Sequence, residues 1–157
     1  MNLLKRSLNA IGMCAVAAGL VFTTAQADIT APGDVVIENL AINKALTNVA
    51  GDPEKGKAVF VNRKEGNCLA CHANSDLSDH LFHGEVGPSL DGVGGRWNEA
   101  MLRTILVNAK AVFTKETVMP GFYSLDVGAN VRESLIGKTI LEAQQIEDLV
   151  AYLSQLK

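Results

Sequence analysis

Apolar side chains recur at helical spacing in several stretches of this chain, and the clearest lies at its end, in TILEAQQIEDLVAYLSQLK (residues 139–157). Four of them fall at positions i, i+3, i+4 and i+7: Ile146, Leu149, Val150 and Leu153. This period predicts an amphipathic helix with one buried face. Thr139 and Glu142 stand at the spacing of a capping box, so we expect the helix to open there.

Two earlier segments show similar signals. Asp52 precedes Pro53 and Glu54, which gives a cap, a proline at the first helical position and an acid in the first turn. Gly56 and Phe60 then fall on one face of that helix, four residues apart.

The third helical segment is predicted around residues 98–110. Its apolar side chains repeat at helical spacing: Met101, Leu102, Ile105, Leu106 and Ala109. We expect this stripe, including Met101, to pack in the core. No segment reads as a paired strand and no internal repeat is visible, so the sequence predicts an all-α domain.

The first 27 residues have the pattern of a secretory signal. Lys5 and Arg6 precede an apolar run from about Ile11 to Phe22, and the segment closes on Ala25-Gln26-Ala27. The alternative is an uncleaved anchor helix, which the absence of a basic flank after the run disfavours. Removing 27 of 157 residues leaves 130, enough for one small domain. We expect a signal peptide at 1–27, an N-terminal extension at 28–50, a domain at 51–157, and a periplasmic location.

Cleavage changes the charge and the cysteine count. Without Lys5 and Arg6, 12 of the 14 basic residues remain against 17 acidic ones, a net charge of −5. This balance argues against nucleic acid and anionic membrane surfaces as partners, and no membrane insertion is expected after cleavage. Cys14 lies in the signal, so Cys68 and Cys71 are the cysteines of the mature chain.

The segment GNCLACH, residues 66–72, allows three interpretations. A redox dithiol needs a preceding strand and a βαβ context, which the flanking sequence does not offer. A zinc site could recruit His80 and His83, but the loop is short and the histidine spacing unusual. Covalent haem attachment uses Cys68 and Cys71 as thioethers and His72 as axial iron ligand. We favour this third interpretation, which predicts one haem c.

The sixth iron position has several candidate ligands. Met119 is followed by Pro120 and Gly121, which prevent a helix and fix a turn that would hold the thioether rigidly. We expect Met119 to be the ligand. His80 and His83 lie in an acidic loop where solvated histidines are ordinary, and one of them as ligand stays an alternative. His/Met ligation leaves no open position and raises the reduction potential relative to bis-His ligation, which favours electron transfer.

From about Gly51 to Lys157 the sequence resembles the class I cytochromes c, in the Gly56/Phe60 helix, CLACH, GPSLDGV, the methionine loop and a last helix with LVAYL. The resemblance implies a haem enclosed by three or more helices, with close packing of the first and last helices at Gly56. It also implies that the Pro88 carbonyl accepts the second ring N–H of His72. Arg96 and Trp97 resemble residues that reach haem propionates. A plain loop turn, an exposed arginine and a core tryptophan are the alternatives.

The ordered set GNCLACH, FHGEVGPSLDGVGGRW, VMPGFYS and ILEAQQIEDLVAYL, with the extension before it, resembles the SoxX family, the monohaem subunits of SoxAX cytochrome complexes. The resemblance implies a heterodimer with a SoxA-like haem subunit. Such a complex, an L-cysteine S-thiosulfotransferase, couples thiosulfate to a cysteine on a carrier protein. This chain would accept the electrons and pass them to a downstream acceptor. A diffusible cytochrome c carrier and a zinc or thiol structural module are the alternatives.

Two further expectations follow from the residues. If Cys68 and Cys71 both form thioethers, the mature chain has no free thiol, so sulfur transfer must occur on a partner. The extension is too apolar for a solvated tail. It should therefore either contact a partner or wrap its own domain.

Overall fold

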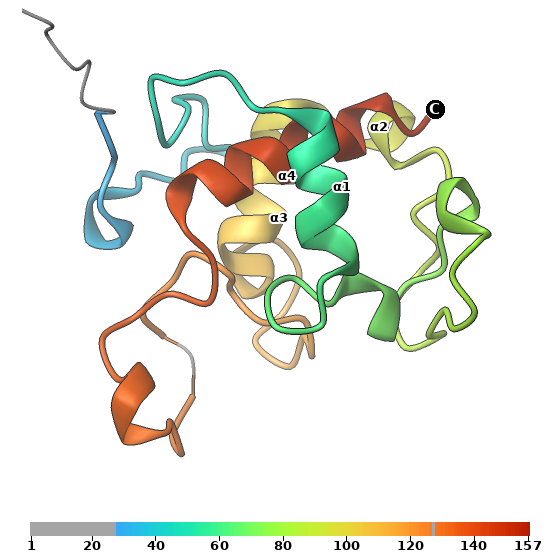
Figure 1. Cartoon of the computed structure of the whole chain (residues 1–157). Coiled ribbons are helices and arrows are strands. Elements are labelled where there is room, and N and C mark those ends of the chain that lie inside the picture. The colour runs from blue at the N-terminus through green and yellow to red at the C-terminus, as the bar shows by residue number, and fades with distance from the viewer. Residues whose placement is uncertain (1–27, 127) are drawn as a thin grey trace, which may run out of the picture.

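The structure is a computed structural model, and it describes residues 28–126 and 128–157. The signal peptide predicted at 1–27 lies outside these residues. Figure 1 shows α4 lying across α1, with α3 behind the crossing and the C-terminus near α2. The α-helices of the described part are α1 (Pro53–Val61), α2 (Val93–Arg96), α3 (Glu99–Val112) and α4 (Ala143–Gln155). Within the same residues, strand pairing is limited to two isolated bridges, which confirms the all-α prediction.

Helix α1 begins as the sequence predicts and packs closely against α4. The Asp52 carboxylate accepts hydrogen bonds from the backbone N–H groups of Glu54 and Lys55, at 3.0 and 3.3 Å. At Gly56 the two backbones touch, because a Cβ there would lie 2.0 Å from the Asp148 carbonyl oxygen. Only a residue without a Cβ permits this approach.

The apolar stripe of α4 is buried, but the start of the helix differs from the prediction. Ile146 and Leu149 are fully buried, and Val150 and Leu153 nearly so. The capping box is formed by Glu142 and Gln145, not by Thr139. The Thr139 hydroxyl instead donates to the Leu141 carbonyl, 2.6 Å away, in the turn before the helix. A local hydrogen bond to the backbone thus competes with the capping role.

Helix α3 exists as predicted, but its buried face is displaced from the predicted stripe. Met101 and Ile105 are only half-buried, so the prediction of Met101 as a core residue is wrong. The core face carries Leu102, Leu106 and Val107 together with the polar Arg103 and Thr104. The two polar side chains are tolerated inside because both find hydrogen-bond partners.

The N-terminal extension wraps its own domain in its second half. Ile42 and Leu46 are buried in the common core, and the Ile42 N–H donates to the Ala100 carbonyl at the start of α3. The first half is different, since Val36 and Leu40 are 66% and 46% exposed. The expectation that the extension wraps its own domain is therefore confirmed for residues 42–47.

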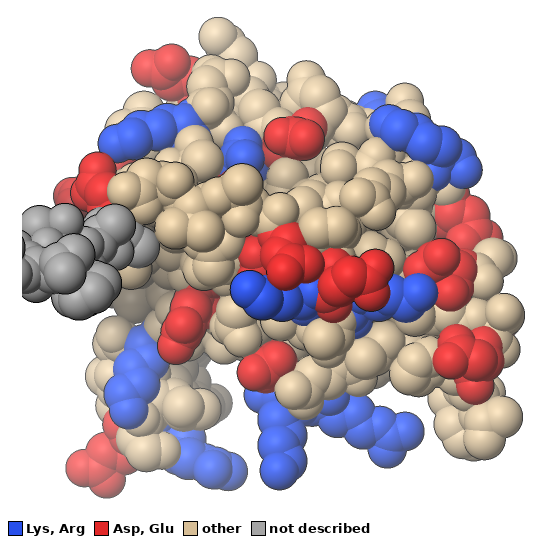
Figure 2. Space-filling view, turned by 45° about the horizontal axis from the view of Figure 1, so that its top comes forward, with Lys and Arg blue, Asp and Glu red and all other residues tan. Residues whose placement is uncertain are grey.

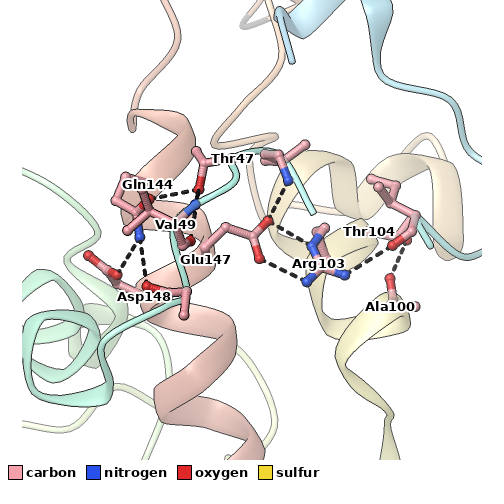
Figure 3. Close-up of polar contacts among 11 residues, drawn as sticks. Thr47, Val49, Ala100, Arg103, Thr104, Gln144, Glu147 and Asp148 are labelled. Carbon is pink, nitrogen blue, oxygen red and sulfur yellow. Dashed lines mark hydrogen bonds and ion pairs between the residues drawn. The ribbon is translucent and has the colours of Figure 1, made fainter. Parts of the chain in front are cut away.

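Buried polar side chains fix this extension to α3 and α4 (Figure 3). Arg103 forms a two-pronged ion pair with Glu147, with both N–O distances 2.8 Å, and donates a third hydrogen bond to the Ile42 carbonyl. Glu147 in turn accepts the Leu46 N–H at 2.8 Å. Asp148 accepts the N–H of Asp52 just before α1. One network therefore joins the extension and three helices.

None of the helices in residues 28–126 and 128–157 has the length and apolarity needed to cross a membrane.

Candidate haem site

The CxxCH segment forms a single tight turn directly after α1. Asn67 adopts a left-handed backbone conformation, with φ 49°, and a 3-10 turn, η2, follows at Cys68–Ala70. The N–H groups of Cys71 and His72 both donate to the Cys68 carbonyl, at 3.1 and 3.0 Å. Both thiols and the imidazole therefore emerge from one turn of backbone.

The imidazole of His72 is oriented by the segment Gly87-Pro88. The Nδ1 atom lies 2.7 Å from the Pro88 carbonyl oxygen. Because a carbonyl can only accept, Nδ1 carries the ring proton and Nε2 keeps its lone pair. A Cβ at Gly87 would lie 2.3 Å from Cε1 of the ring, so glycine is required for this contact. A metal ion can therefore be bound through Nε2 alone.

Cys68 and Cys71 are not joined to each other as a disulfide. Burial raises the pKa of the Cys68 thiol to about 12. A redox dithiol needs an attacking thiolate, whose pKa is lowered by its surroundings. The environment of Cys68 does the opposite, which disfavours the dithiol interpretation and suits a buried thioether.

His83 is not a solvated histidine as the sequence suggested. Its Nδ1 accepts the Asn74 N–H at 3.2 Å, and its Nε2 donates to the Leu77 carbonyl at 3.1 Å. Both ring nitrogens are thus used inside the loop that follows the CxxCH segment, while His80 is exposed. In the described part of the chain, no three His, Cys, Asp or Glu side chains gather as a metal site would require. The zinc interpretation therefore has no support in the contacts of His83.

The loop between the CxxCH segment and α2 is fixed by its own polar side chains. Asp91 accepts both the N–H and the hydroxyl of Ser75, at 2.7 and 2.9 Å. Arg96 donates to the carbonyls of Asp91 and Ser89, at 2.6 and 2.8 Å. Through these bonds Arg96 stabilises the loop that carries Pro88. A role toward a propionate stays a prediction for this residue.

A second anchor ties the same loop to α4. The Tyr152 hydroxyl donates to Asp76, 2.9 Å away, and accepts from the Asn74 amide at the same distance. Asp76 also pairs with Lys57 of α1 at 2.9 Å. These bonds lower the pKa of Asp76, with Lys57 the larger cause. Burial, followed by the bond to Asp76, raises the pKa of the Tyr152 hydroxyl.

Met119 lies half-buried in a turn held against α3. The Lys110 ammonium donates to the Thr117 carbonyl, and the Phe122 N–H donates to the Leu106 carbonyl at 3.0 Å. Met119 packs against the same hydrophobic core as Cys68 and Trp97. The role of Lys110 was not predicted, because its partners lie in a turn without regular periodicity.

The contacts bring some of the predicted site residues together. Backbone and ring hydrogen bonds join Cys68, Cys71, His72 and Pro88, whereas Met119 and Trp97 share only the adjoining core. Trp97 also meets Phe113 edge to face, with the ring centroids 6.3 Å apart. Two thiols on one turn, an imidazole with its outer nitrogen unused and a half-buried thioether fit the donor set of a haem c.

Comparison with known proteins agrees with this geometry. The family model for cytochrome c matches residues 53–157. A chain of the crystal structure of SoxXA from P. pantotrophus is 43% identical, with a TM-score of 0.76, and the match covers 83% of this chain and 99% of that one. Cytochrome c2 from Paracoccus denitrificans is 25% identical with a TM-score of 0.38, covering 67% of this chain and 95% of that one. Ferric cytochrome c-550 from Paracoccus versutus is 22% identical with the same TM-score, covering 68% and 98%.

The family match, which spans α1 to the C-terminus, and the close likeness to a SoxXA chain together settle the class of the protein. The chain therefore belongs to the cytochrome c family, as a SoxX-like class I cytochrome with one covalently bound haem c.

Proposed function

We propose that this chain is the electron-accepting subunit of a periplasmic SoxAX-type complex that oxidises thiosulfate. The observation that carries the proposal is the match to nearly all of one chain of a SoxXA crystal structure, at 43% identity. The partner would be a SoxA-like haem subunit, and the complex would act as an L-cysteine S-thiosulfotransferase. Export would depend on the segment 1–27, which has the pattern of a signal peptide.

The ligand roles belong to the same proposal. Cys68 and Cys71 would form the two thioethers, and His72 and Met119 would be the axial ligands of the iron. The hydrogen bond from Nδ1 of His72 to the Pro88 carbonyl supports this assignment, since it directs Nε2 away from the loop. The haem supplies a one-electron couple when bound. The protein's part is to hold two ligands on rigid segments, so that no position is left for a substrate.

The sulfur chemistry would be carried out on the partner. Joining thiosulfate to a cysteine thiol forms one S–S bond and releases two electrons and one proton. This chain accepts one electron at a time, and with both mature cysteines in thioethers it offers no thiol. We infer that the two electrons leave through this subunit in successive single steps, while the S–S bond forms elsewhere.

Affinity capture of the mature holoprotein from its native periplasm tests the proposal. We expect a second haem-bearing subunit to stay bound through gel filtration and the complex to oxidise thiosulfate in the presence of a carrier thiol. A Met119→Ala bait should retain the partner but lose rapid electron uptake, whereas a Met101→Ala bait should keep both. A lone monohaem chain of unchanged mass would leave a diffusible electron carrier and end the proposal.

A further inference from the structure

The loop that follows the CxxCH segment presents an apolar patch to solvent. Leu81 is 90% exposed, Phe82 77% and Val86 70%. These three side chains are named here the loop patch. The loop itself is not loose, because Leu77 is buried beneath it and His83 is hydrogen-bonded at both ring nitrogens. An ordered loop that holds large apolar side chains outward has the character of a docking surface.

The loop patch is bordered by carboxylates that outnumber the cations near them. Residues 73–92 contain four acidic side chains and no lysine or arginine. Two of the four are engaged within the protein, Asp76 with Lys57 and Asp91 with Ser75. Asp79 and Glu85 flank the patch, are exposed, and form no ion pair with any residue of the described part. Figure 2 shows acidic side chains along the right edge of the molecule, the side on which Figure 1 places these loops.

The patch lies directly over the haem attachment segment. The Gly84 N–H donates to the Leu69 carbonyl and the Gly87 N–H to the Cys71 carbonyl, each at 2.8 Å. The backbone that carries the loop patch is therefore hydrogen-bonded directly to the segment that holds the haem cysteines. Electron tunnelling weakens with each non-bonded gap, so a short connection of this kind favours transfer at this face.

A second apolar surface lies on another side of the molecule. Figure 1 shows the segment before α4 projecting away from the body, opposite the loops that follow α1. It exposes Leu125, Leu135, Ile136 and Ile140, each by 42% or more. Residues 125–140 carry two basic and two acidic side chains, so this surface lacks the uniform negative charge of the loop patch. The near-neutral apolar surface suits a permanent subunit, and the acidic one suits a transient redox partner.

We propose that the loop patch, with Asp79 and Glu85, is the exit face for electrons, where a small one-electron redox protein with a basic, apolar docking face binds transiently. In the step itself, one electron leaves the reduced iron centre and reduces the acceptor by one electron; no bond changes and no proton moves. This inference rests on the proposed function, because it assigns the downstream acceptor of that electron path. Complementary charge would steer the encounter and make its rate fall with added salt.

The test uses the purified complex, reduced with ascorbate and mixed rapidly with an oxidised blue-copper protein whose docking face is lysine-rimmed. The D79N/E85Q pair should slow the transfer about 3- to 10-fold at low ionic strength, with the difference fading at high salt. Phe82→Ser should slow it at every salt concentration. The matched pair D28N/E99Q, the same charge change at two exposed sites that belong to neither apolar surface, should leave the rate unchanged. Ferricyanide, a small anion that needs no docking, should not be slowed by D79N/E85Q.

Two results would overturn the proposal. One is a D79N/E85Q rate equal to that of the D28N/E99Q control. The other is protection of residues 79–86 from hydrogen exchange by the haem-bearing partner subunit, which would make the patch the permanent interface. Because ascorbate supplies the electrons, this experiment can fail for the exit face without testing whether thiosulfate reduces the complex. The two proposals can therefore be rejected separately.

Discussion

The Met119 thioether lies in a turn that is fixed to α3 at two points, by Lys110 and by the backbone N–H of Phe122. We expect Met119→Ala to abolish the weak methionine–iron charge-transfer band. The reduction potential should fall by something on the order of 0.1 V, a fraction of the range of about 0.8 V that axial ligands span. Optical spectra and a redox titration measure both. Met101→Ala, on the half-buried side of α3, is the control and should change neither. An unchanged band in Met119→Ala would move the assignment to another residue.

Asp76 contributes to stability only while it is ionised. Its pKa is lowered in the folded protein, first by Lys57 and then by the Tyr152 hydroxyl. Its contribution is therefore present above 3.8, the ordinary pKa of an aspartate, and lost as the pH falls through the lowered pKa of the folded state.

We expect Asp76→Asn to be less stable than the parent protein at neutral pH, by under about 1 kcal/mol because the pair is exposed. The difference should shrink as the pH falls below 3.8 toward the lowered folded pKa of Asp76. Urea unfolding of the holoprotein at neutral pH and at a series of acidic pH values measures this. Asp79→Asn, which lacks an ion pair within the described residues, should show no such convergence. A pH-independent difference for Asp76→Asn would contradict the assignment.

The crossing of α1 and α4 depends on Gly56. A Cβ there would lie 2.0 Å from the Asp148 carbonyl oxygen, so Gly56→Ala must push the two helices apart. We expect a loss of about 3 kcal/mol or more, as for other substitutions that overpack a core. Thermal unfolding of the holoprotein measures it.

Gly95→Ala is the matched control, because a Cβ at that helical position meets nothing within 4 Å. Its effect should be neutral, or stabilising by about 0.4–1 kcal/mol. Equal stability of Gly56→Ala and Gly95→Ala would show that the helices can move apart at no cost.

The buried ion pair holds the extension to α3 and α4. The side chains of Arg103 and Glu147 are 7% and 5% exposed. Glu147→Ala leaves the buried Arg103 guanidinium without its counter-charge and the Leu46 N–H without an acceptor, and should cost about 3–5 kcal/mol. The double substitution Arg103→Met with Glu147→Leu removes both charges and should cost less. Denaturant unfolding, with limited proteolysis of residues 28–50, compares them. A smaller loss in Glu147→Ala than in the double variant would contradict this role.

At the level of elements, periodicity located three helices because each carries a local signal. The cap formed by Asp52 could be predicted from the residues, since capping is a short-range requirement, whereas the close packing at Gly56 followed from the family resemblance. The role of Thr139 could not be predicted, because its hydroxyl binds the nearby Leu141 carbonyl and does not cap the helix. The environments of Met101 and His83 could not be predicted either, because they depend on how the surrounding segments pack. Arg103 is 44 residues from Glu147, and its single charge in an apolar stripe gave no sign of the partner.

The residues of the candidate site also divide into those that the sequence could predict and those that it could not. The CxxCH spacing is local, so Cys68, Cys71 and His72 were identified from the sequence, and the Pro88 contact followed from the family resemblance. The loop contacts of Arg96 and Lys110 were not predicted, because a surface cation has many possible partners and only the fold determines which one it meets.

At the scale of the whole molecule, the protein has two distinct outer surfaces around one haem-binding core. The acidic loop patch lies over the CxxCH segment, and a near-neutral apolar surface lies before α4. The extension adds a third feature, since its first half leaves Val36 and Leu40 exposed. A subunit that takes electrons from a permanent partner and passes them to a transient one needs this separation of surfaces.

The most direct test of the account is rapid mixing of the oxidised complex with thiosulfate and a thiol-bearing carrier protein, while the haem of this chain is followed by its own spectrum. We expect this haem to become reduced by one electron, at a rate that matches thiosulfate consumption, and only when the partner subunit is present. Consumption of thiosulfate with this haem still oxidised would contradict the account, and so would reduction of the isolated chain by thiosulfate alone.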